Sequence, residues 1–168
     1  GTFRSGDGGS HWMEIPARGA LVVGADSVLY GFETSSIYFV PQVFRSEDFG
    51  ATWQLLSSSP FPFIPIYGGF WMTSIPHGLL AGGSLSLRRS VDRGDSWQDS
   101  ISGLQASTVN SLAVDRQDPA SLYGVRSDAT RAERLQHSPD RGSSWESLVV
   151  APEEGRPYIT DFAIDPFA

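Results

Sequence analysis

Cysteine and lysine are both absent from this chain of 168 residues. Without cysteine the protein has no disulfide and no thiolate ligand for a metal. All 12 basic residues are arginines, the net charge is −7, and no basic cluster occurs. Nucleic acids and anionic membranes both select for concentrated positive charge, so the composition disfavours both as partners.

Long apolar runs are lacking too, and no segment approaches the ~20 apolar residues that a membrane-spanning helix needs. We therefore expect no membrane insertion. The sequence contains no phosphate-binding loop, no nucleophile elbow of the G-x-S-x-G type and no zinc-ligand spacing. These absences disfavour nucleotide hydrolysis, serine esterase activity and zinc catalysis, and we expect neither a metal nor a cofactor.

Glycine and proline are plentiful, at 18 and 11 residues, and the apolar fraction is 40%. This combination is typical of many short strands joined by tight turns. No stretch shows the 3.6-residue periodicity of a long amphipathic helix. The composition and patterning therefore predict an all-β chain of short antiparallel strands.

One pattern, Ser-x-Asp-x-Gly-x-x-Trp, occurs four times, and we name the copies box 1 to box 4. Their aspartates are separated by 41, 44 and 48 residues, within the period of propeller blades. An arginine precedes the serine in boxes 1 to 3, and a histidine takes its place in box 4. The conserved positions of the pattern are Ser5, Asp7, Gly9 and Trp12 in box 1; Ser46, Asp48, Gly50 and Trp53 in box 2; Ser90, Asp92, Gly94 and Trp97 in box 3; and Ser138, Asp140, Gly142 and Trp145 in box 4.

The residue types of each box suit a β-hairpin turn. Aspartate and serine side chains bond to nearby backbone groups, glycine supplies a positive φ, and tryptophan covers the turn with an apolar face. A catalytic residue is needed once per site, whereas these residues recur at every blade. We interpret the boxes as structural turns rather than as acids, bases or metal ligands.

The repeats divide the chain into one propeller domain, residues 1–168, built from four-stranded antiparallel blades. We expect about four blades in all. The approximate ranges are 1–17 (the last hairpin of a blade), 18–59, 60–104, 105–151, and 156–168 (the first strand of another blade). This division predicts a partial propeller, and open blade edges would favour self-association.

The boxes resemble the Asp-box, or BNR, repeat. Together with Leu112-Ala-Val-Asp-Arg-Gln-Asp-Pro-Ala-Ser-Leu-Tyr-Gly124, they resemble photosystem II stability/assembly factor-like proteins, sortilin-type domains and xyloglucanase-like glycoside hydrolases. The resemblance implies that the boxes lie on the outer rim of the propeller, away from a ligand face around the central channel. It also implies an extracytoplasmic location, secreted or periplasmic. It implies no catalytic residue, because these relatives have unrelated functions.

A few residues outside the repeat are candidates for function. Trp71, and more weakly Tyr67 and Tyr38, could stack on a sugar ring, although a buried aromatic in an inner strand explains them as well. Asp161 is the weak catalytic candidate, since the equivalent residue of the preceding repeat is Ser111. Other carboxylates that could belong to a catalytic pair are Asp26, Glu33, Asp115, Asp128 and Asp165.

These observations favour a non-catalytic propeller scaffold that binds a protein or a glycan. The alternative is part of a carbohydrate-active glycoside hydrolase, xyloglucanase-like or sialidase-like, with paired carboxylates. A structural module beside another enzymatic domain is a third possibility.

Overall fold

The computed structural model describes most of the chain. The described residues are 2–16, 19–24, 27–34, 41–56, 59–61, 70–83, 86–104, 108–127, 133–148, 159 and 162–165. Within these ranges every regular element is a β-strand, and no helix is long and apolar enough to cross a bilayer.

The strands form three four-stranded antiparallel sheets and one two-stranded hairpin. The hairpin consists of β1 (Thr2–Arg4) and β2 (Met13–Ile15). The first sheet contains β3 (Ala20–Val23), β4 (Leu29–Thr34), β5 (Pro41–Ser46) and β6 (Gln54–Leu55). The second contains β7 (Trp71–Ile75), β8 (Gly78–Gly83), β9 (Ser86–Ser90) and β10 (Gln98–Asp99). The third contains β11 (Thr108–Val114), β12 (Leu122–Ser127), β13 (Glu133–Ser138) and β14 (Glu146–Ser147).

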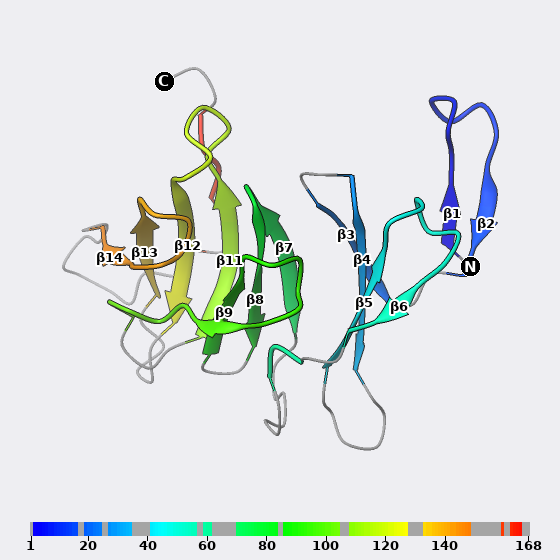
Figure 1. Cartoon of the computed structure of the whole chain (residues 1–168). Coiled ribbons are helices and arrows are strands. Elements are labelled where there is room, and N and C mark those ends of the chain that lie inside the picture. Colours follow the sequence, from blue (N-terminus) through cyan, green and yellow to red (C-terminus); the bar gives the residue numbers. More distant parts are fainter. Residues whose placement is uncertain are drawn as a thin grey trace.

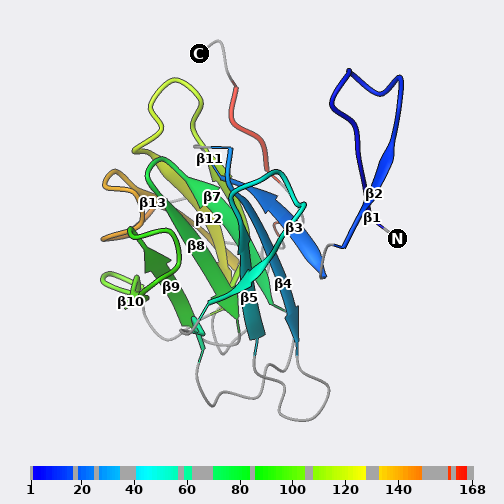
Figure 2. The same ribbon diagram turned by 45° about the vertical axis from the view of Figure 1, so that its right-hand side comes forward.

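Each four-stranded sheet is a meander in which every strand pairs with the next one along the chain. Boxes 2 to 4 each connect the third strand of a sheet to its short fourth strand, and box 1 connects β1 to β2. The three sheets stand next to one another, and the β1–β2 hairpin extends beyond the first sheet at the N-terminal end of the row (Figure 1, Figure 2). This arrangement is that of propeller blades, each packed face to face against the next.

The core lies between the sheets rather than on one side of them. Neighbouring residues of a strand point to opposite faces of the sheet. On β8, Leu79 therefore packs with Val43 and Met72 between the first and second sheets, while Leu80 packs with Trp145 between the second and third. Because both faces are covered, β8 is buried along almost its whole length and reads as a continuous apolar strand.

The prediction of an all-β chain of four-stranded antiparallel blades is confirmed. The further blade expected over residues 156–168 stays a prediction, because the structure describes only residues 159 and 162–165 of this range and assigns no strand to them. Ile164 lines a cavity of about 390 Å³ with Ala113, Val114 and Arg116. The predicted blade boundaries outside the described strands stay predictions.

Candidate functional site

The four boxes share one set of hydrogen bonds. In each box the serine Oγ donates to the aspartate Oδ1 at 2.8–2.9 Å, and the glycine N–H donates to that Oγ at 2.7–2.8 Å. The box glycines have φ between +82° and +95°, a conformation that residues with a Cβ rarely adopt. The serine, aspartate and glycine of each copy therefore close one turn together.

The residue before the tryptophan distinguishes box 1 from the others. In boxes 2 to 4 it is Thr52, Ser96 or Ser144, and its hydroxyl donates to the second carboxylate oxygen of the aspartate. In box 1 it is His11, whose Nδ1 lies 2.5 Å from Asp7 Oδ2. The His11 side chain is almost fully exposed, so box 1 presents an imidazole where the other boxes present a bonded hydroxyl.

Hydrogen bonds keep the box carboxylates ionised. The Thr52 hydroxyl and backbone N–H lower the pKa of Asp48 to about 2, and the backbone N–H and ring of His11 lower the pKa of Asp7 to about 2. Partial burial acts to raise the pKa of Asp92 and Asp140, but the bonds from the neighbouring serines outweigh it and the pKa is lowered. Groups with such low pKa values are poor general acids near neutral pH.

This electrostatic arrangement predicts acid sensitivity. A carboxylate whose pKa is lower in the folded chain stabilises the fold above its unfolded pKa of about 3.9, and this contribution disappears as pH falls through the folded value. We expect the urea midpoint of unfolding to drop between about pH 4 and about pH 2. Asp48→Asn should show a smaller drop than the unmodified chain. An equal drop in both would contradict a role of this carboxylate in the turn.

In boxes 1 to 3, the arginine before the box serine reaches the next box along the chain. Arg4 donates to the backbone oxygen of Phe49 at 2.7 Å, and Arg45 donates to that of Arg93 at 3.2 Å. Arg89 donates to the carbonyl oxygen of Arg141 at 3.3 Å and to Ser143 Oγ at 2.5 Å. The three acceptor residues follow the box aspartate and have φ of +57° to +61°. Three successive seams between boxes thus carry the same contact.

These contacts predict a measurable loss when one of them is removed. Arg89→Met keeps the apolar stem of the side chain and loses its bonds to box 4. We expect a loss of about 1–3 kcal/mol in the free energy of unfolding, since these are hydrogen bonds from a charged donor. Arg134→Met, at an exposed position of β13, should change it by less than about 0.5 kcal/mol. Equal effects of the two substitutions in urea titrations would contradict the inter-box role.

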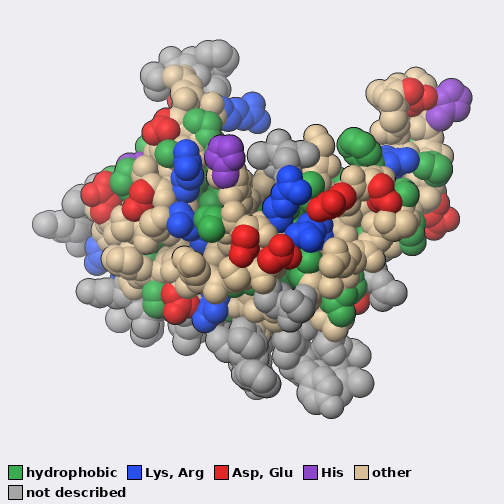
Figure 3. Space-filling view, viewed as in Figure 1, with side chains coloured by type: hydrophobic (Ala, Val, Ile, Leu, Met, Phe, Trp, Pro, Cys, Tyr) green, Lys and Arg blue, Asp and Glu red, His purple; other side chains and the backbone are tan. Residues whose placement is uncertain are grey.

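The first seam, between boxes 1 and 2, contains a cavity of about 660 Å³. Three of its side chains are large, apolar and more than half exposed: Trp12 at 64%, Phe49 at 57% and Met13 at 54%. The remaining lining residues are Arg4, Ser5, Gly6, Asp7 and His11. We name this feature the first-seam groove. It lies on the hairpin that protrudes at the upper right of Figure 3, where hydrophobic, basic and acidic side chains adjoin one another.

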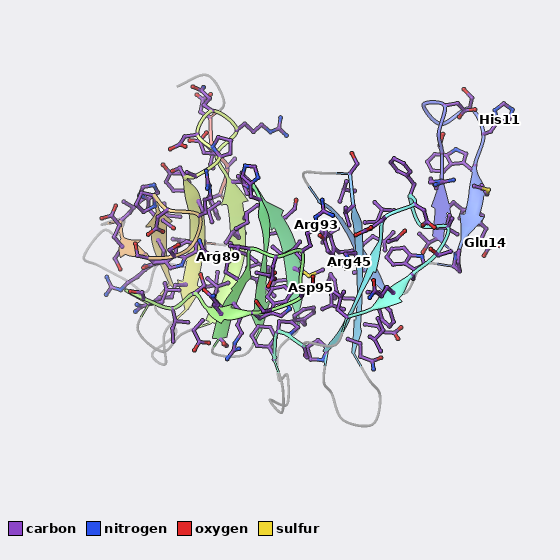
Figure 4. The ribbon with its side chains drawn as sticks, in the orientation of Figure 1. His11, Glu14, Arg45, Arg89, Arg93 and Asp95 are labelled. Carbon is purple, nitrogen blue, oxygen red and sulfur yellow. The ribbon has the colours of Figure 1, made fainter. Side chains whose placement is uncertain are left out.

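The second seam is filled by charged side chains. Arg45 lies 3.1 Å from Asp95 and 3.5 Å from Glu47, and Glu47 lies 3.6 Å from Arg93. Figure 4 shows Arg45, Arg93 and Asp95 clustered between the first and second sheets, whereas His11 and Glu14 lie apart on the hairpin. When the boxes are aligned, three charged residues of the second seam correspond to uncharged residues of the first seam. Glu47 corresponds to Gly6, Arg93 to Phe49, and Asp95 to Ala51.

The predicted ligand residues lie elsewhere or outside the described part. Trp71 is partly buried on β7; its indole N–H donates to the Val109 carbonyl oxygen at 2.9 Å, and its ring lies against the backbone of Gly82. Tyr38, Tyr67 and Asp161 fall outside the described residues, as do Asp26 and Asp128. Asp115 accepts bonds from the backbone of Gln117 and Asp118, within its own turn.

Sequence reasoning does not single out the groove residues, because each of them belongs to a box or its flank. The alignment of the four copies does carry a signal: the position of Gly6 holds a larger residue in each of the other boxes, and the position of Phe49 holds arginine in boxes 3 and 4. Within the described ranges, no group of three histidines and carboxylates lies close enough to hold a metal ion.

Comparison with known proteins gave likenesses of structure only. No family model matches the chain, and no curated protein matches its sequence. The structure is similar to YCF48 bound to D1 peptide, with 17% identity and a TM-score of 0.60 over 88% of this chain and 46% of that one. It is also similar to the GH74 xyloglucanase from Xanthomonas campestris, with 23% identity and a TM-score of 0.54 over 79% of this chain and 23% of that one.

A third similar structure is the GH74 enzyme from Niastella koreensis, at 21% identity and a TM-score of 0.50, over 79% of this chain and 18% of the enzyme. The chain thus spans less than half the length of each of these proteins. All three are β-propeller proteins, and at these identities the likeness concerns the fold alone. The chain is an all-β protein built from blades of a β-propeller.

Proposed function

We propose that this chain is a non-catalytic β-propeller scaffold that binds a protein partner, with its four boxes serving as turns of the Asp-box type. The observation that carries the proposal is the first-seam groove, an exposed apolar cavity at a place where the second seam holds ion pairs. Contiguous exposed apolar surface rimmed by polar groups is typical of protein interaction sites. An extracytoplasmic location belongs to the same proposal and rests on the resemblance of the boxes.

The box carboxylates support a structural role in this proposal. Oδ1 of each accepts a serine hydroxyl and the backbone N–H of the residue before the tryptophan, and the pKa of each is lowered. A glycosidase needs one carboxyl group with a raised pKa to protonate the leaving group. The four box aspartates therefore have the wrong electrostatic environment for that general acid.

The alternative is a part of a glycoside hydrolase, for which the fold likeness to the GH74 xyloglucanase is the specific reason. The two functions predict different products. Incubation of the chain with xyloglucan and with sialyllactose should release no reducing sugar and no sialic acid if it is a binding scaffold. Turnover that is lost in one carboxylate-to-amide variant of normal stability would overturn the proposal and establish the hydrolase.

A further inference from the structure

The side chains of the first-seam groove differ from those at the equivalent positions of the other seams, and this difference determines which kind of ligand the groove can bind. We propose that it binds an extended protein segment in which an apolar side chain is flanked by lysine or arginine. This inference rests on the proposed scaffold function and names the chemistry of its partner.

The groove is open because uncharged residues stand at three positions that are charged at the second seam. At the second seam, Glu47 and Arg93 form an ion pair at 3.6 Å across the space between the boxes. At the first seam the same positions hold Gly6 and Phe49, and a Cβ built on Gly6 would meet nothing within 4 Å. The space that an ion pair occupies at one seam is therefore free at the other, and an aromatic ring borders it.

The apolar wall of the groove presents ring faces rather than polar edges. The indole N–H of Trp12 donates to the Gly9 carbonyl oxygen at 3.0 Å, so its donor is already satisfied within the box. One edge of the ring lies over Gly9, and the side chain is still 64% exposed. Together with Met13 and Phe49, this ring can bury an aliphatic or aromatic side chain of a partner.

Charge favours a cationic partner. The hairpin, residues 2–15, carries two carboxylates, Asp7 and the exposed Glu14, against one arginine, Arg4, and the whole chain carries a net charge of −7. Lysine and arginine are attracted to the faces of tryptophan and phenylalanine as well as to carboxylates. A segment with basic residues on either side of an apolar one complements both features.

The same bonds disfavour a sugar as the occupant. A saccharide needs several free donors and acceptors to replace the water bound to its hydroxyls. Here the Ser5 hydroxyl, the Trp12 indole N–H and both Asp7 carboxylate oxygens already have partners within box 1. The groove therefore offers apolar surface and charge more than free polar groups.

The test uses the full chain and blocked hexapeptides whose third residue is a phenylalanine flanked by lysine, by serine or by glutamate. Binding is followed by NMR through the indole N–H of Trp12 and the backbone amides of residues 4–13 and 47–51. We expect the lysine-flanked peptide to bind about tenfold more tightly than the glutamate-flanked one at low salt, with the serine-flanked peptide between them.

The double variant Gly6→Glu/Phe49→Arg rebuilds the ion pair of the second seam in the groove. Arginine already occupies the equivalent left-handed position in boxes 3 and 4, so the variant should fold normally, which its melting temperature checks. We expect it to weaken binding of the lysine-flanked peptide about tenfold or more. Val91→Glu makes the equivalent change in box 3, outside the groove, and should leave binding unchanged.

The outcomes separate this inference from the proposed function. Binding that survives Gly6→Glu/Phe49→Arg, or that shifts only residues of β7 and β11, overturns the groove while a binding scaffold still stands. Absence of binding by all three peptides, or binding of a xyloglucan oligosaccharide at the Trp12 indole instead, overturns the peptide partner. Hydrolysis of the oligosaccharide would overturn the proposed function itself.

Discussion

Replacing Trp145 by alanine is expected to lower the free energy of unfolding by about 3–5 kcal/mol. Trp145 is only 5% exposed and packs with Ile75, Leu80 and Val109 in the core between the second and third sheets. Its removal would leave a large cavity between two blades, and close-packed sheets can relax into such a cavity only in part. Urea titration followed by circular dichroism measures the loss.

Box 1 supplies the matched control for this substitution. Trp12 occupies the same place in the repeat but is 64% exposed. Trp12→Ala should therefore cost less than about 1 kcal/mol, because it removes little buried surface. Similar losses in the two variants would contradict the packing described for the second and third sheets.

Replacing Gly103 by alanine should be comparably severe, at about 3 kcal/mol. Gly103 has φ of +83°, and a Cβ at this position would lie 1.9 Å from the backbone oxygen of Trp145. Alanine disfavours this φ, and backbone atoms cannot move aside as a side chain can. The segment that leads from the second sheet to the third would have to shift to accommodate the methyl group.

Gly6→Ala is the control, because Gly6 has no left-handed φ and a Cβ there meets nothing within 4 Å. It should change the free energy of unfolding by less than about 0.5 kcal/mol. A Gly103→Ala variant as stable as Gly6→Ala would contradict the close approach of residue 103 to Trp145.

The fold was predictable because its repeat is local. The box serine, aspartate and glycine bond to one another within five residues, so their pattern appears directly in the sequence. The arginine contacts were not predictable in the same way. Arg4, Arg45 and Arg89 are visible before three boxes, but their acceptors lie 45 to 54 residues away and are mostly backbone oxygens.

The residues of the proposed binding site are harder to predict from the sequence, for two reasons. The sequence favours Trp71 because it is a tryptophan outside the repeat, yet its ring lies against Gly82 and its N–H donates to the neighbouring sheet. Trp12 was assigned to the scaffold with the other box tryptophans, although its exposure differs from that of Trp145 by more than half of the side chain. Equivalent positions in the repeat predict the same turn, but they do not predict how much of each tryptophan is covered by neighbouring residues.

We expect the boxes to build the scaffold and the first-seam groove, rather than the first strands of the blades, to bind the partner. Hydrogen–deuterium exchange of the chain with and without the lysine-flanked hexapeptide tests this claim directly. We expect added protection in residues 4–13 and 47–51, with boxes 3 and 4 unchanged. Protection confined to β7 and β11 would contradict it and would place ligand binding at the inner strands.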